Sequence, residues 1–173
     1  MKLETKRLRL RAPEVRDAQS FAAIYNSEFV LRFNAMVPTT VERVTEKFAD
    51  PECGTHTVLL EEKQTGTLIG AIFLEEDDLR YGVASRSLSY FLRQEDTRRG
   101  YMKEALHAVI AWLFETENLE CVSARAFAPN AASRALLHSL GFQENGIIPH
   151  CVKGYGGVIY DDVIHTLLPE DFQ

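Results

Sequence analysis

The stretch TRRGYMKEA, residues 97–105, decides the fold because it joins a strand-like run to a helix-like segment. The run before it, LSYFL (88–92), is apolar, and the segment after it repeats apolar residues at helical spacing over 102–116. A helix N-terminus exposes unpaired backbone N–H groups and carries a partial positive charge. Gly100 allows the backbone to approach a bulky anion closely. The stretch therefore indicates a candidate phosphate site at a strand–helix junction.

Basic side chains crowd this junction, and two interpretations of them stay open. Arg98, Arg99 and Lys103 add positive charge at the end of a helix where phosphate groups bind. The same residue types also occur at solvated helix starts without a ligand, although there they oppose the helix dipole. The stretch matches neither G-x-x-x-x-G-K-[ST] nor G-x-G-x-x-G. This disfavours a P-loop NTPase and a Rossmann dinucleotide-binding site.

The rest of the chain alternates strand-like and helix-like segments without a repeat, linker or low-complexity tract. Alternating or continuous apolar runs predict strands, and apolar residues at helical spacing predict helices. The expected strands cover residues 7–13, 56–62, 66–76, 86–93, 121–127 and 157–168, and the expected helices cover residues 14–27, 39–50, 102–116 and 130–140. The pattern predicts one α+β domain over residues 1–173, with antiparallel hairpins and at least one strand–helix–strand crossover.

Composition narrows the function classes. The 173 residues carry 25 acidic and 19 basic side chains, a net charge of -6, which disfavours nucleic acid as the main partner and suits a cationic small molecule or a basic protein tail. The three cysteines are far apart and show neither a disulfide framework nor metal spacing, so we expect a reducing cytoplasm. No apolar run is long enough for a signal peptide core or a membrane span, so we expect neither secretion nor membrane insertion.

A second segment, FAPNAASRALLHSLGF (127–142), follows the next expected strand. Asn130 is a typical N-cap and Ser133 lies in the first turn, so the segment taken alone is typical of a well-capped helix that packs on a core. Together and in this order, the two segments resemble the GNAT acetyltransferase superfamily, and within it the Rim-type acetyltransferases of ribosomal protein N-termini. The resemblance extends to LETKRLRLRAPEVRDAQSF (3–21) and YDDVIHTLL (160–168), and so covers nearly the whole chain.

The resemblance implies a central, mostly antiparallel twisted sheet of six to seven strands flanked by about four helices. It implies acetyl-CoA as cosubstrate, no metal ion, and direct transfer of the acetyl group to a primary amine in a ternary complex. The amine belongs to a protein N-terminus or to a small molecule, and relatives are often homodimers. Relatives line the acceptor pocket with the region that here holds Phe29, Phe33 and Met36, although core packing or a dimer contact would explain these apolar residues equally.

By the same resemblance, the backbone N–H groups of residues 98–102 cradle the pyrophosphate of CoA, and Asn130 hydrogen-bonds the pantetheine arm. Ser133 matches a serine near the thioester sulfur and is the candidate for protonating the departing thiolate. A strand N–H near Leu92 is the expected donor to the oxyanion. The implied cofactor-binding residues are Leu92, Arg93, Thr97, Arg98, Arg99, Gly100, Tyr101, Met102, Lys103, Asn130 and Ser133.

Four positions depart from the family pattern. They are Thr97, where glutamine or arginine is usual, Met102, where a small residue is usual, Ser87, where relatives often carry glutamate, and Leu137, where many carry tyrosine. The missing tyrosine favours Ser133 as the group that meets the thiolate, yet the departures also fit weak catalysis. A rival hypothesis is therefore a CoA-binding sensor or interaction module with the same fold. A nucleotide-binding regulatory domain is a further rival that rests on the phosphate-friendly loop alone.

The general base is the least determined part of the expected site. A base is needed because an α-amino group with a pKa of ~8, or a lysine with a pKa of ~10, is mostly protonated at pH 7. Glu75, Glu76 and His150 are the candidates. The alternatives are an acidic turn for the two glutamates and a structural or exposed position for the histidine.

Overall fold

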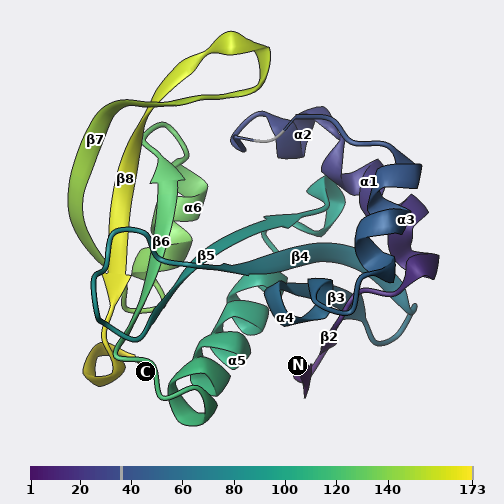
Figure 1. Cartoon of the computed structure of the whole chain (residues 1–173), viewed down its shortest axis with the longest axis horizontal. Helices are drawn as coiled ribbons and strands as arrows, with labels where there is room; N and C mark the ends of the chain where they lie inside the picture. The colour runs from purple at the N-terminus through teal and green to yellow at the C-terminus, as the bar shows by residue number, and fades with distance from the viewer. Residues whose placement is uncertain (36, 173) are drawn as a thin grey trace.

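A single eight-stranded sheet runs through the protein, whose computed structural model describes residues 1–35 and 37–172 (Figure 1). The strands are β1 (Lys2–Glu4), β2 (Leu8–Arg11), β3 (Thr57–Glu62), β4 (Thr67–Glu75), β5 (Ser85–Leu92), β6 (Cys121–Phe127), β7 (Gln143–Lys153) and β8 (Ile159–Leu167). Their order is β1-β2-β3-β4-β5-β6-β8-β7, and every neighbouring pair is antiparallel except β5–β6. The expected α+β class with a mostly antiparallel sheet is confirmed, with eight strands rather than six to seven.

Six α-helices accompany the sheet in the described part of the chain. They are α1 (Ala18–Tyr25), α2 (Glu28–Leu31), α3 (Val41–Ala49), α4 (Cys53–His56), α5 (Tyr101–Thr116) and α6 (Ala131–His138). The four expected helices correspond to α1, α3, α5 and α6, and the two additional ones, α2 and α4, are single turns of four residues. Within residues 1–35 and 37–172, none of the helices has the length and apolar character that crossing a membrane requires.

Two hydrophobic clusters hold helices against opposite faces of the sheet. The larger cluster packs α5 and α6 against strand residues such as Leu10, Ile72 and Leu88, which are almost completely buried. The smaller cluster packs α1 and α3 against the other face, where Phe73 and Phe91 contact Phe21 of α1 edge to face. Because neighbouring residues of a strand face opposite sides, Leu88, Tyr90 and Leu92 of β5 share the side of α5 and α6.

The outer strand β7 was missed at the sequence level, for a physical reason. Its residues include Gly146 and Pro149, which are uncommon inside strands. The strand lies at the edge of the sheet and pairs only with β8, with register shifts at Glu144/Gly146 and Ile148/Val152. Edge strands tolerate proline and bulges because one row of their backbone groups needs no partner strand. Local patterns therefore predicted no strand before residue 157, although residues 143–153 form β7.

The two parallel strands β5 and β6 separate along their length. Their paired residues run from Ser85↔Cys121 to Leu88↔Ala124, while β5 continues to Leu92 and β6 to Phe127. Figure 1 shows the two strands diverging, with α6 next to β6 and the β7–β8 hairpin extending toward the end of the molecule that carries α2. The divergence opens the sheet between the C-terminal ends of β5 and β6. This is the position at which the candidate site lies.

Candidate active site

The loop between β5 and α5 is held in place by a buried carboxylate. Asp96 is 3 % exposed, and it accepts hydrogen bonds from Arg93 Nε at 2.7 Å and Arg99 Nη1 at 3.1 Å. Arg7 Nη1 also donates a hydrogen bond to the carbonyl oxygen of Arg99 in this loop, at 2.8 Å. Arg93 and Arg99 therefore brace the loop rather than line the cavity beneath it, although the sequence placed both in the cofactor site.

The backbone of this loop presents a row of free N–H groups. Arg98 has φ +59° and Gly100 has φ +78°, so two left-handed residues flank Arg99 just before α5 begins. Across the described residues, the N–H groups of residues 98–103 donate no hydrogen bond, and the first donor is Glu104 N, which bonds to the carbonyl of Gly100. Successive N–H groups around left-handed residues form anion-binding concavities, and a helix N-terminus adds its partial positive charge.

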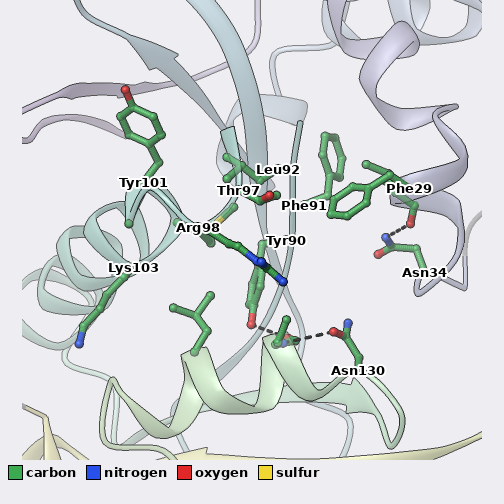
Figure 2. Close-up of a pocket in the computed structure, with 16 residues that line it drawn as sticks. Phe29, Asn34, Tyr90, Phe91, Leu92, Thr97, Arg98, Tyr101, Lys103 and Asn130 are labelled. Atoms are coloured by element: carbon green, nitrogen blue, oxygen red, sulfur yellow. Dashed lines mark hydrogen bonds between the residues drawn. The ribbon is translucent and has the colours of Figure 1, made fainter. Parts of the chain in front are cut away.

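A cavity of about 440 Å³ extends from these N–H groups toward α6 and α2. Figure 2 shows side chains reaching it from the loop, from β5, from α6 and from the α2 region. The lining residues are Phe29, Val30, Asn34, Tyr90, Phe91, Leu92, Thr97, Arg98, Gly100, Tyr101, Met102, Lys103, Asn130, Ala132, Ser133 and Leu136. The structure thus brings together all the residues predicted for the cofactor site except Arg93 and Arg99.

The far end of the cavity carries a pair of hydroxyl groups. Asn130 Oδ1 caps α6 by accepting from the backbone N–H of Ser133 at 3.2 Å, as the sequence predicted. The Oγ of Ser133 lies 2.7 Å from the phenolic oxygen of Tyr90, which points from β5 toward α6 (Figure 2). Burial raises the pKa of Tyr90 to about 12, although the hydrogen bond with Ser133 opposes this rise. Tyr90 was missed at the sequence level, where only its place in LSYFL on the side of Leu88 and Leu92 indicated that it faces α6.

A second network joins the N-terminal strands to the start of α5. Glu104 Oε1 accepts from Thr5 Oγ1 at 2.6 Å and from Arg7 N at 2.8 Å, while Glu104 Oε2 accepts from Arg7 Nε at 2.7 Å. The Arg7 guanidinium also lies 4.3 Å from the ring centre of Tyr101. Burial alone would raise the pKa of Glu104, but the bonds from Thr5 and Arg7 outweigh it and lower that pKa below its ordinary value. We call Thr5, Arg7, Tyr101 and Glu104 the Arg7 clamp.

The three residues proposed as general base lie outside the cavity lining. Glu75 is exposed at the end of β4, where it pairs with Ser87 of β5, and Glu76 is exposed in the following loop. His150 lies on β7, where its backbone N–H donates to Asp161. Of the described residues that line the cavity, those that ionise are two tyrosines, an arginine and a lysine, namely Tyr90, Tyr101, Arg98 and Lys103.

Two further expectations have mixed outcomes. Leu137, at the position where many relatives carry tyrosine, is fully buried in the larger cluster. Phe29 lines the cavity, the ring centre of Phe33 lies 6.2 Å from that of Tyr160 on β8, and Met36 lies outside the described residues.

Residues 1–35 and 37–172 contain no group of three or more histidine, cysteine, aspartate or glutamate side chains that could hold a metal ion.

The family of the chain follows from comparison with known proteins. The family model described as "Acetyltransferase (GNAT) domain" matches residues 7–143, which contain the whole loop, α5 and α6. The chain belongs to the GNAT acetyltransferase family. The predicted family is therefore confirmed, and the cavity lies where this GNAT chain opens its sheet between β5 and β6.

Related GNAT sequences and structures cover almost the whole chain. An uncharacterised N-acetyltransferase p20 of Bacillus licheniformis is 25 % identical over 178 residues, covering 98 % of this chain and 97 % of its own. The uncharacterised N-acetyltransferase YoaA of Bacillus subtilis (strain 168) is 26 % identical over 176 residues and 96 % of both chains. These relatives agree with the family assignment along the full length of the chain.

Solved structures share the fold at lower identity. A GNAT-family acetyltransferase from Bacillus anthracis superposes with a TM-score of 0.86 at 18 % identity, covering 98 % of this chain and 99 % of that one. A ribosomal-protein-S5-alanine acetyltransferase from Vibrio fischeri has a TM-score of 0.84 at 19 % identity, covering 100 % and 99 %. Mycobacterium smegmatis RimJ in complex with CoA-disulfide has a TM-score of 0.77 at 18 % identity, covering 94 % and 82 %. Neighbours with Rim-type names are thus among the proteins that share this fold.

Arg98 gives a prediction that separates backbone strain from charge. A non-glycine residue at φ +59° is strained. We expect Arg98→Gly to raise the free energy of unfolding by about 0.5–1 kcal/mol, because glycine adopts this conformation without strain. Arg98→Ala keeps the strained Cβ, so its unfolding free energy should stay near that of the wild type. Urea denaturation of both variants checks this, and a glycine variant less stable than the alanine variant would contradict it.

Proposed function

We propose that this protein transfers the acetyl group of acetyl-CoA to a primary amine by direct attack in a ternary complex. The observation that carries the proposal is the row of free N–H groups at residues 98–103, which opens into the same cavity as Asn130 and Ser133. Amides that are not needed by the fold are available to an anion, and a cavity that leads away from them has room for a chain attached to that anion.

The residues of the cavity fit the shape and charge of this cosubstrate. The N–H groups of residues 98–103 would hold its diphosphate, and the cations of Arg98 and Lys103 line the same space. Leu92 and Met102 offer apolar contacts to the pantetheine arm, and Asn130 offers a side-chain amide. Bound acetyl-CoA would supply the activated acetyl thioester. Ser133 would place its hydroxyl near the departing sulfur.

The ionisable lining residues favour an α-amino acceptor over a lysine side chain. None of Tyr90, Tyr101, Arg98 and Lys103 is a carboxylate or an imidazole, the usual general bases at neutral pH, so the amine must reach the thioester largely as the neutral species. At pH 7 roughly a tenth of an α-amino group with a pKa of ~8 is neutral, against roughly 1 in 2,500 of a lysine with a pKa of ~10.4. The neighbour named as a ribosomal-protein-S5-alanine acetyltransferase supports an α-amine of a protein or peptide.

Calorimetry tests the proposed function without knowledge of the acceptor. Titration with acetyl-CoA and with desulfo-CoA should show one binding site per chain, with affinity that falls as salt is raised, because part of the attraction is between charges. The control is pantetheine, which lacks the diphosphate and should bind far more weakly. Failure of acetyl-CoA to bind at moderate salt would contradict the assignment.

A catalytically weak CoA-binding module is the second candidate. The buried Leu137 at the usual tyrosine position and the exposed positions of Glu75 and Glu76 favour it. Thiol release with a panel of α-amines separates the two, because a module binds acetyl-CoA without acceptor-dependent release. If release occurs, Ser133→Ala should reduce it, whereas Ser139→Ala, at the exposed end of α6, should leave it unchanged. The cytoplasmic location and the homodimer remain predictions.

A further inference from the structure

We infer that Tyr90 positions the hydroxyl of Ser133 by donating a hydrogen bond to its Oγ, which leaves the proton of Ser133 directed at the departing sulfur. The inference rests on the proposed function, because it assigns a residue within the same cavity. It adds Tyr90 of β5 to the stabilisation of the thiolate, for which the sequence indicated only Ser133 of α6. Tyr90 is thus a positioning residue that acts through Ser133.

The geometry sets the two hydroxyls together from independent elements. The backbone N–H of Ser133 is held by the side chain of Asn130, which fixes the first turn of α6. Tyr90 extends from the part of β5 that has already separated from β6. Both residues line the cavity, and their oxygens are 2.7 Å apart. Tyr90 therefore meets Ser133 on the wall of the cavity that β5 and α6 form (Figure 2).

The direction of the bond follows from the acidities of its two partners. A phenol is a stronger acid than an aliphatic alcohol, so Tyr90 is the better donor and Ser133 the better acceptor. With the pKa of Tyr90 raised to about 12 by burial, the phenol keeps its proton throughout the neutral range. Without this bond, the serine hydroxyl can turn back to a carbonyl one turn earlier, as serines in helices commonly do. Tyr90 therefore holds Ser133 in the orientation that serves the cavity.

The same acidities decide what the pair does for the reaction. During transfer a C–N bond forms, the C–S bond breaks, the electron pair leaves on sulfur, and one proton passes from the amine nitrogen to water. Full proton transfer from Tyr90 through Ser133 to the departing thiolate is uphill, because a thiol is a stronger acid than a phenol whose pKa burial raises to about 12. The pair therefore stabilises the thiolate as a hydrogen-bond donor. This refines the expected role of Ser133 as a proton source.

The ionisation of bound CoA tests the inference without an acceptor. The ultraviolet absorbance of the thiolate reports the pKa of the CoA thiol in the complex, and the complex with desulfo-CoA supplies the blank for the three cysteines and the tyrosines. Ser133→Ala should raise this pKa by about one unit, because a charge-assisted hydrogen bond to the thiolate is lost. Tyr90→Phe should raise it by about half a unit, because Ser133 remains but is no longer oriented.

The double variant identifies how Tyr90 acts. In the Ser133→Ala background, Tyr90→Phe should cause no further rise in the thiol pKa. An equal rise in both backgrounds would mean that Tyr90 meets the sulfur directly, and no rise in either would mean that Tyr90 only packs; both results overturn the inference. A Ser133→Ala variant with the wild-type thiol pKa overturns it as well. If CoA does not bind to the wild type at all, the proposed function itself has failed.

Two further variants test whether the effect of Tyr90→Phe is only structural. Tyr25→Phe is the matched control, because burial also raises the pKa of Tyr25, yet its ring packs on Phe21 and Phe91 in the cluster on the other face of the sheet. It should leave the thiol pKa unchanged. If Tyr90→Phe does not fold, site-specific replacement of Tyr90 by a fluorotyrosine keeps the hydroxyl and makes it more acidic. The thiol pKa should then fall below the wild-type value, and an unchanged value overturns the inference.

Discussion

Gly100→Val is expected to weaken acetyl-CoA binding about a hundredfold, or by about 2.7 kcal/mol, while the sheet remains folded. Gly100 has φ +78° and immediately precedes α5, so its conformation sets the path of the loop whose N–H groups, at residues 98–103, have no partner in the described part of the chain. A β-branched residue is a severe outlier at this φ. The loop should therefore rearrange, and hydrogen bonds from several amides to a charged diphosphate should be lost together. Calorimetry with acetyl-CoA measures the loss.

Gly66→Val is the matched control for this experiment. Gly66 has φ +67° in the turn between β3 and β4, and a Cβ added there meets no other atom within 4 Å. Both variants should lose a similar 1–2 kcal/mol or so of unfolding free energy, because both force a side chain into the left-handed region. Only Gly100→Val should lose affinity for acetyl-CoA. Equal affinities in the two variants would show that the amides near Gly100 do not bind the diphosphate.

Glu104→Ala is expected to lower the free energy of unfolding by about 2 kcal/mol and to weaken acetyl-CoA binding as well. The substitution leaves Arg7 N and Arg7 Nε without their acceptor, and it leaves Thr5 Oγ1 with only its longer bond, 3.4 Å, to the carbonyl of Leu8. The side chain of Arg7 is 37 % exposed and that of Glu104 is 19 % exposed, so solvent screening keeps the cost below that of a fully buried pair. Binding should weaken because Arg7 also holds the carbonyl of Arg99 in the loop.

Glu117→Ala, at the other end of α5, is the control for the Arg7 clamp. Its carboxylate lies 3.7 Å from Arg86 Nε, a longer contact than that between Arg7 and Glu104, and its side chain is more exposed than that of Glu104. We expect a change of no more than about 0.5 kcal/mol in the unfolding free energy, and none in acetyl-CoA affinity. Chemical denaturation and calorimetry on both variants make the comparison. Comparable losses for the two substitutions would mean that the clamp has no special role.

The contribution of Glu104 should also depend on pH in a defined direction. Its pKa is lowered in the folded protein from the ordinary value of 4.5, because the bonds from Thr5 and Arg7 outweigh the effect of burial. The folded state therefore holds the proton less tightly than the unfolded state does, and this contribution to stability is complete above pH 4.5 and shrinks as pH falls through the folded pKa. The difference in unfolding free energy between the wild type and Glu104→Ala should narrow in that acidic range.

The sequence supported the parts of the fold that depend on local patterns. The apolar stripe of α5 and the alternation of β2 are properties of neighbouring residues, so periodicity alone located both elements. Gly100 and Asn130 have local roles as well, a left-handed residue before a helix and an N-cap, and the structure shows both. The resemblance then placed these two positions in one site, which hydrophobic periodicity could not have done.

The remaining features of the site depend on contacts between distant residues. Tyr90 and Ser133 are 43 positions apart, and Arg7 and Glu104 are 97 apart, so no local rule pairs them. The edge strand β7 contains residues with low strand propensity, and its pairing with β8 overrides that preference. The base candidates were chosen by residue type, but the direction in which Glu75 and His150 face depends on register and on the β7–β8 hairpin.

The free N–H groups at residues 98–103 have a consequence for how this protein diverges. Every residue has a peptide group. A ligand that is bound by backbone N–H groups therefore depends on the path of the backbone, and binding can persist when the side chains change. Thr97 and Met102 can therefore differ from the usual residues while the path between Arg98 and Lys103 persists. Substitutions should be tolerated at positions such as Thr97 and Met102, and least at Gly100, which turns left-handed before α5, and at Asp96, whose buried carboxylate holds the loop.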